Sequence, residues 1–169
     1  EERCVYTMVI DPKMEKAING QIRAELESAY LYLSMASWFD ANDLGGCAHW
    51  MKKQFEEEQE HAMKLYEYVV TRGGRVILEA IAEPKHEWKS ATEIFEQTLA
   101  HEQLVTSLIY GLVELAEELK DHATREMLSW FVKEQVEEEE HAMEILAKFK
   151  RVGEVPISLV MLDKELAAR

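Results

Sequence analysis

Four long stretches of the sequence carry apolar side chains at alternating three- and four-residue spacing, and this pattern most constrains the fold. Such spacing places apolar residues along one face of an α-helix. The chain has 169 residues but only seven glycines and three prolines, which fall near the ends of these stretches. A chain of this length folds as one domain with a sizeable core. The sequence therefore predicts an all-α domain of four helices, each about 40 Å long at a rise of about 1.5 Å per residue.

Residues that favour helix ends give approximate bounds for the helices. Asp11 followed by Pro12 is typical of an N-cap and a first helical position. Gly73 can adopt the left-handed conformation that ends a helix, and Ser90 with Glu93 forms the pattern of a capping box. The predicted helices span residues 12–42, 46–72, 91–119 and 123–151.

The predicted four-helix bundle occupies residues 11–151 and leaves a short segment at each end of the chain. Residues 1–10, which include the first methionine at Met8, are expected to be an N-terminal extension. After Gly153 and Pro156 the segment "ISLVMLDKELAAR" predicts a short fifth helix over 156–167. We expect one domain throughout 1–169.

The connection between the second and third helices decides the topology. It has about 17 residues, which can extend about 55 Å and therefore run the length of a helix. The other connections are short and require antiparallel neighbours. We expect this segment to be a crossover between two parallel helices, with a mobile surface loop as the alternative.

Acidic and amide side chains interrupt each apolar stripe at a matching depth. The interrupting residues are Glu25, Glu58 with His61 one turn on, Glu102, and Gln135 with Glu138. An unpaired carboxylate in an apolar bundle costs several kcal/mol, so these groups are expected to bind a cation. Oxygen-rich ligation with one imidazole suits iron or manganese, with zinc as an alternative. The arrangement contains most of the di-iron carboxylate pattern of helical bundles.

A repeated heptapeptide raises the question of which histidine belongs to this set. "EEQEHAM" at 57–63 reappears as "EEEEHAM" at 137–143, so both His61 and His141 follow a glutamate by three residues. Glu102 follows Glu25 by 77 residues, and the same offset takes His61 to Glu138 rather than to His141. His141 also falls toward the edge of its apolar face. We therefore predict that His61 is a ligand and that His141 is not.

Composition favours a metal cation over an anionic partner. The net charge of −14 argues against nucleic acid and anionic membranes as partners. Cys4 and Cys47 form no CxxC pair, which argues against a zinc or rubredoxin-type iron site and against a disulfide framework. No segment has the pattern of a signal peptide or a membrane span. We therefore expect a reducing, cytoplasmic setting.

Five segments resemble the non-haem ferritins of bacteria and archaea. They are "QIRAELESAYLYLSMASWFD", "WMKKQFEEEQEHAMKLYEYV", "HEQLVTSLIYGLVELA", "WFVKEQVEEEEHAMEIL" and "LDKEL", and the likeness extends over nearly the whole chain from about Met8. The resemblance implies a ferritin-like four-helix bundle. It also implies an iron-storage function, with a ferroxidase that oxidises Fe(II) by dioxygen at a di-iron centre. The ferric mineral would lie inside a homo-oligomeric shell of twenty-four subunits.

The resemblance also assigns site residues. The positions that match the ferroxidase centre are Glu25, Glu58, His61, Glu102 and Gln135, with Glu58 bridging two irons. Tyr32 matches a tyrosine that supplies an electron beside the centre. A third iron site, or the route to the mineral, matches Glu57, Glu134, Glu137 and Glu138. The short fifth helix matches the one that packs around four-fold axes in ferritins.

Two other classes of function remain as alternatives, namely a di-iron redox protein of the bacterioferritin or rubrerythrin type and a structural helical bundle. Bacterioferritins are similar, but they have a methionine for haem where this chain has Gln59, so no haem is expected. A rubrerythrin-like peroxidase would be a di-iron redox enzyme on the same bundle, and such proteins usually append a CxxC iron domain that the sequence lacks. A structural bundle with buried glutamate networks would require the five matching ligand positions to be coincidental.

Overall fold

The computed structural model describes residues 9–153 and 155–169, and its regular structure there is entirely helical. The helices are α1 (Pro12–Ala41), α2 (Gly45–Thr71), α3 (Ala91–Glu118), α4 (His122–Val152) and α5 (Pro156–Leu166). These bounds agree with the predicted ones to within one residue at each end. The prediction of an all-α four-helix bundle with a short fifth helix is confirmed. Most of the predicted N-terminal extension, including Cys4, lies outside the described residues.

The helix ends follow from local hydrogen bonds of the predicted type. The Asp11 carboxylate accepts a hydrogen bond from a backbone N–H in the first turn of α1, at 2.8 Å. Gly73 has a φ of 69°, a conformation that costs glycine little. Ser90 Oγ accepts from Glu93 N at 3.1 Å, but the Glu93 carboxylate accepts in return from Lys89 N, one residue before the expected partner. The Glu93 side chain therefore bonds Lys89, which lies in the segment that precedes α3.

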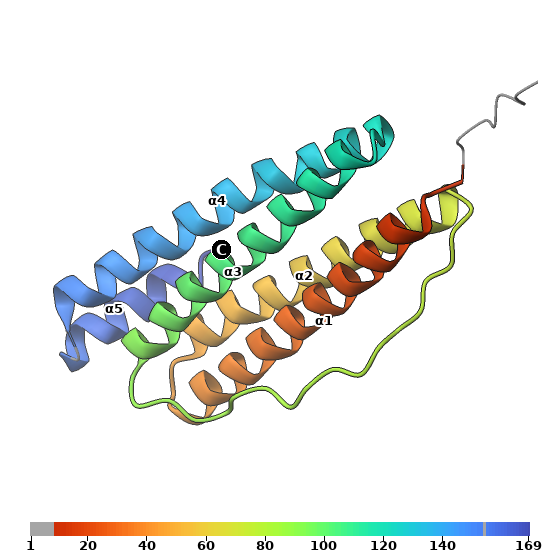
Figure 1. The fold of residues 1–169 in the computed structure, drawn as a ribbon. Coiled ribbons are helices and arrows are strands. Elements are labelled where there is room, and N and C mark those ends of the chain that lie inside the picture. Colours follow the sequence, from red (N-terminus) through yellow and green to blue (C-terminus); the bar gives the residue numbers. More distant parts are fainter. Residues whose placement is uncertain (1–8, 154) are drawn as a thin grey trace, which may run out of the picture.

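The bundle consists of two antiparallel helix pairs. Figure 1 shows α1 beside α2 and α3 beside α4, with α2 and α3 running in the same direction. Close backbone contacts are most numerous within each pair, and α1 also approaches α3. None of the described helices is long and apolar enough to cross a membrane.

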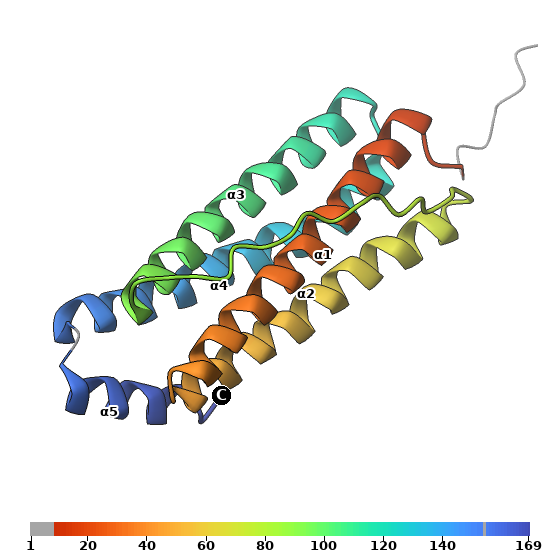
Figure 2. The ribbon, with the colours of Figure 1, turned by 90° about the horizontal axis from the view of Figure 1, so that it is seen from below.

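The segment from residue 72 to residue 90 is the expected crossover. It lies along α1 over most of the length of that helix in both ribbon views (Figures 1 and 2). The Asn19 side chain bonds the backbone of Arg75 and of Ile77, at 3.0 Å and 2.9 Å. Farther along, Ser34 Oγ donates to the Lys85 carbonyl at 2.7 Å. Side chains of α1 thus bond the crossover at both of its ends, which favours a crossover that packs on α1 over the alternative of a mobile loop.

Helix α5 lies across the end of the bundle, where α2 begins and α4 ends (Figure 2). It packs against both of these helices. Cys47 N donates to Asp163 Oδ1 at 2.8 Å. Close approach of the two helices depends on Gly46, because a β-carbon there would lie 1.7 Å from the Asp163 carbonyl oxygen.

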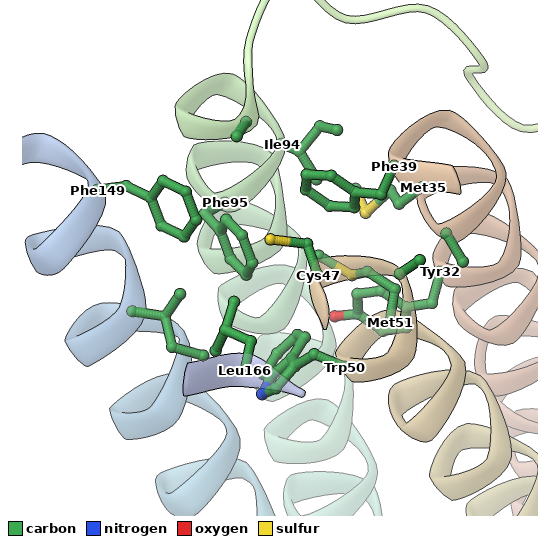
Figure 3. Close-up of a cluster of buried hydrophobic side chains, with 14 of the residues drawn as sticks. Tyr32, Met35, Phe39, Cys47, Trp50, Met51, Ile94, Phe95, Phe149 and Leu166 are labelled. Carbon is green, nitrogen blue, oxygen red and sulfur yellow. The ribbon is translucent and has the colours of Figure 1, made fainter. Parts of the chain in front are cut away.

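The apolar core is divided into two clusters. Figure 3 shows the cluster at the α5 end, where Phe95 stacks on Phe149 with ring centroids 4.7 Å apart and Cys47 lies among apolar side chains. The second cluster, at the other end of the bundle, includes Ile18 and Phe131. Along α1 to α4, the buried polar residues Glu25, Glu58, Glu102 and Gln135 fall between residues of the two clusters.

Candidate metal centre

Three of the predicted ligands converge in the middle of the bundle. Glu25 on α1, together with Glu58 and His61 on α2, each place one ligand atom within 4.8 Å of the others. His61 Nδ1 lies 3.4 Å from Glu58 Oε2 and 3.9 Å from Glu25 Oε2. The exposed fractions of Glu25, Glu58 and His61 are 1%, 1% and 4%. Two carboxylates and an imidazole therefore face one another away from bulk water.

Two of these carboxylate oxygens have no hydrogen-bond partner among the described residues. They are Glu25 Oε2 and Glu58 Oε2, whereas Glu25 Oε1 accepts from Gln21 Nε2 at 2.8 Å. Burial raises the pKa of Glu25 well above its ordinary value, and the neighbouring charge of Glu58 raises it further. Burial also raises the pKa of Glu58, with repulsion from Glu102 adding to the effect. A bound cation would relieve both the missing partners and the repulsion.

Glu102 lies beside this group on α3 and is held by two neighbours. Tyr32 donates its phenolic O–H to Glu102 Oε1, and Gln135 Nε2 lies 3.2 Å from Glu102 Oε2. Burial raises the pKa of Glu102, although both hydrogen bonds act in the opposite direction. The amide nitrogen of Gln135 also lies 3.2 Å from the Glu102 carbonyl oxygen. In this arrangement Gln135 positions Glu102, and ligation by Gln135 would use its amide oxygen.

Tyr32 is fully buried on α1. Burial raises its pKa well above the ordinary value, and the charge of Glu102 raises it further, so the side chain is a neutral phenol at neutral pH. The edge of its ring also contacts His101, with centroids 5.9 Å apart. Because Tyr32 donates a hydrogen bond to Glu102, its phenol is in direct contact with a predicted ligand.

A second group of possible ligands shares His61 with the first. One ligand atom from each of His61, Glu134 and Glu138 lies within 4.8 Å of the others. Burial raises the pKa of Glu138 to about 7, and the charge of Glu102 contributes. Gln54 Nε2 donates to Glu138 Oε2 at 2.9 Å. This second group lies on the α2–α4 side of the bundle.

The remaining acidic residues predicted for a third site lie farther out. Glu57 is half-exposed and pairs with Arg169, at 2.6 Å between Glu57 Oε2 and Arg169 Nη2. Glu137 and His141 are exposed on α4. The burial of His61 and the exposure of His141 agree with the predicted difference between them, and the ligand assignment itself remains a prediction.

Sequence reasoning missed several residues that contact these groups. Gln21 and Gln54 bond Glu25 and Glu138, and the ring of Trp130 meets His61 edge-on at 5.4 Å. A signal was present for Gln21, because it precedes its partner Glu25 by four residues, about one turn of helix. Gln54 bonds Glu138 on a different helix, so local spacing did not predict its contact. Arg169 gave no such signal.

A bundle with a long crossover and carboxylates facing one another across its core defines the class of ferritin-like carboxylate proteins. The ferritin-like domain family matches residues 15–152. The chain is 42% identical over 161 residues to the bacterial non-haem ferritin of Bacteroides fragilis, covering 95% of this chain and 100% of that protein. It is 38% identical to the non-haem ferritin of Staphylococcus saprophyticus, covering 95% and 96% of the two chains.

Solved structures agree with the sequence relatives. An open pore ferritin from the hyperthermophilic archaeon Archaeoglobus fulgidus is 51% identical, with a TM-score of 0.94 over 95% of this chain and 98% of that chain. The chain therefore belongs to the ferritin family of iron-storage proteins, and its relatives are the non-haem ferritins of bacteria and archaea.

Proposed function

We propose that this chain is a ferroxidase that oxidises Fe(II) with dioxygen and passes the Fe(III) to a stored mineral. The observation that carries this proposal is the buried group of Glu25, Glu58 and His61, in which two carboxylate oxygens lack partners. Hard carboxylate oxygens bind ferric iron strongly and imidazole binds ferrous iron well, so the group suits both oxidation states. Iron here is the substrate and the stored cargo.

The residues have distinct parts in the proposed reaction. Glu58 shares a ligand group with Glu25 and is repelled by the charge of Glu102, and it would bridge two Fe(II) ions. His61 would bind the ion on the Glu25 side, and Glu102 the other. The two Fe(II) ions would each give one electron to dioxygen, which takes up two protons and leaves as hydrogen peroxide. When a third Fe(II) gives a third electron, Tyr32, which donates a hydrogen bond to Glu102, would give the fourth, and dioxygen with four protons would become two water molecules. The neutral amide of Gln135 would weaken one iron position compared with a carboxylate, which suits iron that moves on.

Product Fe(III) requires a route away from this centre. Glu134 and Glu138 share His61 with the first group. An ion would transfer from the first group to the second through this shared residue. The exposed Glu137 would continue the route toward solvent. We propose that this route ends at the mineral.

We further propose that the chain assembles into a cytoplasmic shell of twenty-four copies. Three apolar side chains of α5, Ile157, Val160 and Met161, are exposed in the single chain and would be covered by neighbouring copies. Particle size in solution tests this proposal. A shell sediments as a single large species, whereas sedimentation as monomer or dimer at every salt concentration contradicts the storage function.

The ferroxidase proposal is tested by Glu58→Ala, with Glu56→Ala as its control. Glu58 is buried in the site, whereas Glu56 is exposed on the same helix and pairs with Lys53 at 2.7 Å. In aerobic stopped-flow oxidation of Fe(II), Glu58→Ala should abolish the rapid phase and Glu56→Ala should retain it. An undiminished rapid phase in Glu58→Ala would overturn the assignment.

A further inference from the structure

The contacts of Arg169 connect α5 to the second ligand group. We propose that Arg169 is a positioning residue that weakens cation binding at the site of His61, Glu134 and Glu138, with Glu57 at its edge. This inference rests on the proposed function and concerns the route by which iron leaves the oxidation centre. Arg169 follows α5, and α5 brings it beside the middle of α2.

Several contacts fix the Arg169 guanidinium in place. Its Nη2 atom lies 2.6 Å from Glu57 Oε2, and its Nη1 atom donates to Gln54 Oε1. The guanidinium also lies over the Trp50 ring, 4.7 Å from the centroid. The backbone oxygen of Arg169 is 2.9 Å from His49 Nε2. Only a quarter of the side chain is exposed, so this is a held cation and not a solvated surface charge.

The first effect of Arg169 is on the orientation of the Gln54 amide. A guanidinium has only donors, so the Gln54 atom that faces it must be the oxygen. The amide nitrogen then faces Glu138, where it donates to Oε2 at 2.9 Å. That hydrogen bond occupies one lone pair of Glu138 Oε2 and so leaves fewer for a metal ion. Without Arg169 the amide can reverse and offer its oxygen to a cation bound by Glu138.

The second effect of Arg169 is on charge. Its guanidinium pairs with Glu57 and removes one negative charge from the edge of the site. A cation that enters from the oxidation centre therefore meets a weaker field and a competing positive charge. Both effects lower the affinity of the outer site, and the side-chain contacts of Arg169 are with Gln54, Glu57 and Trp50 and not with the ligands Glu25 and Glu58. Iron would consequently pass the outer site instead of remaining there.

The test measures cation binding without turnover. Zn²⁺ is the probe, because it accepts carboxylate and imidazole ligands and has no redox chemistry. Arg169→Ala should tighten the third Zn²⁺ per chain about fivefold, the equivalent of one partly exposed ion pair. The matched control is Arg125→Ala, because Arg125 pairs with Glu117 at 3.2 Å near the turn between α3 and α4. The control should leave all Zn²⁺ affinities unchanged.

Zinc anomalous scattering from crystals soaked at one Zn²⁺ concentration locates the third ion. Occupancy beside Glu138 should be higher in Arg169→Ala than in the unaltered protein. Equal or lower occupancy, with the first two ions bound normally, overturns the inference and leaves the proposed function intact. If the unaltered protein does not bind two Zn²⁺ tightly at the centre of Glu25, Glu58, His61 and Glu102, the proposed function fails instead.

A second variant covers the case in which Arg169→Ala loosens α5 and disturbs the assembly. Arg169→Lys keeps a positive charge for Glu57, but a single ammonium cannot reproduce the planar fork that holds Glu57 and Gln54 together. Its third Zn²⁺ should bind more tightly than in the unaltered protein and less tightly than in Arg169→Ala. Affinity equal to or below that of the unaltered protein in a correctly assembled Arg169→Lys shell overturns the inference.

Discussion

Gly46 lies directly against the backbone of Asp163, so that α5 can dock only where residue 46 has no side chain. Gly46→Ala should therefore displace α5, because a β-carbon 1.7 Å from a carbonyl oxygen cannot be accommodated. Gly45→Ala is the control, since a β-carbon there meets nothing within 4 Å. We expect Gly46→Ala to weaken the assembled shell in sedimentation experiments and Gly45→Ala to leave it intact. Equal behaviour of the two variants would show that α5 docks in another way.

His61→Ala and His141→Ala should differ sharply in the rate of Fe(II) oxidation. His61 is buried within 4 Å of two carboxylates, whereas His141 is exposed on α4. His61→Ala removes an imidazole ligand and should lose most of the rapid phase. His141→Ala removes none and should stay within a small factor of the unaltered rate. The reverse result would move the site one turn along α4.

Tyr32→Phe should lower the stability of the protein and remove an electron donor, but it should leave metal binding intact. The change removes the hydrogen bond to Glu102 and leaves a buried carboxylate without that donor, at an expected cost of about 1–3 kcal/mol in unfolding free energy. Urea denaturation of the metal-free protein measures this cost. Tyr110→Phe is the control, because Tyr110 is 47% exposed. Binding of two Zn²⁺ per chain should persist in both variants.

Glu138 should make the metal-free protein less stable as the pH rises. Its pKa is raised from 4.5 to about 7 by burial, so the folded state favours the protonated form. The contribution is fully present below pH 4.5 and is lost as the pH rises through about 7. Glu138→Gln removes this titration and should flatten the dependence. Denaturant unfolding at several pH values, with metal removed by a chelator, compares the two proteins.

The affinity for a metal ion should change with pH in the opposite direction to the stability of the metal-free protein. A cation binds the carboxylate form, so Zn²⁺ affinity at the His61, Glu134 and Glu138 group should rise as the pH rises through about 7. Zinc titrations of the unaltered protein at several pH values measure this rise. Affinity that falls over the same range would exclude Glu138 as a ligand.

The sequence predicted the helices well because their ends depend on local chemistry. Asp11, Gly73 and Ser90 act on backbone groups within a few residues, so a local pattern is sufficient. The burial of Glu25, Glu58 and Glu102 was likewise predictable, since each interrupts a periodic apolar stripe.

Contacts across long stretches of chain were not predictable in the same way. The pairing of Arg169 with Glu57 depends on the direction in which α5 leaves α4 and on the close approach at Gly46. The Glu93 carboxylate reached Lys89 N instead of the expected Ser90 N–H, because the crossover turns back over the start of α3. Such details require the packed structure.

The division of the bundle into two antiparallel pairs has a consequence for how the chain acquires its structure. Within each pair the contacting residues are close in sequence, so each hairpin of helices can form early, before the slower closure of the crossover. Glu25, Glu58 and His61 belong to one hairpin, and Glu102, Gln135 and Glu138 to the other. Docking of the two hairpins therefore brings mutually repelling acids together, as with Glu58 and Glu102. A cation that binds carboxylates of both halves would offset this repulsion and favour docking.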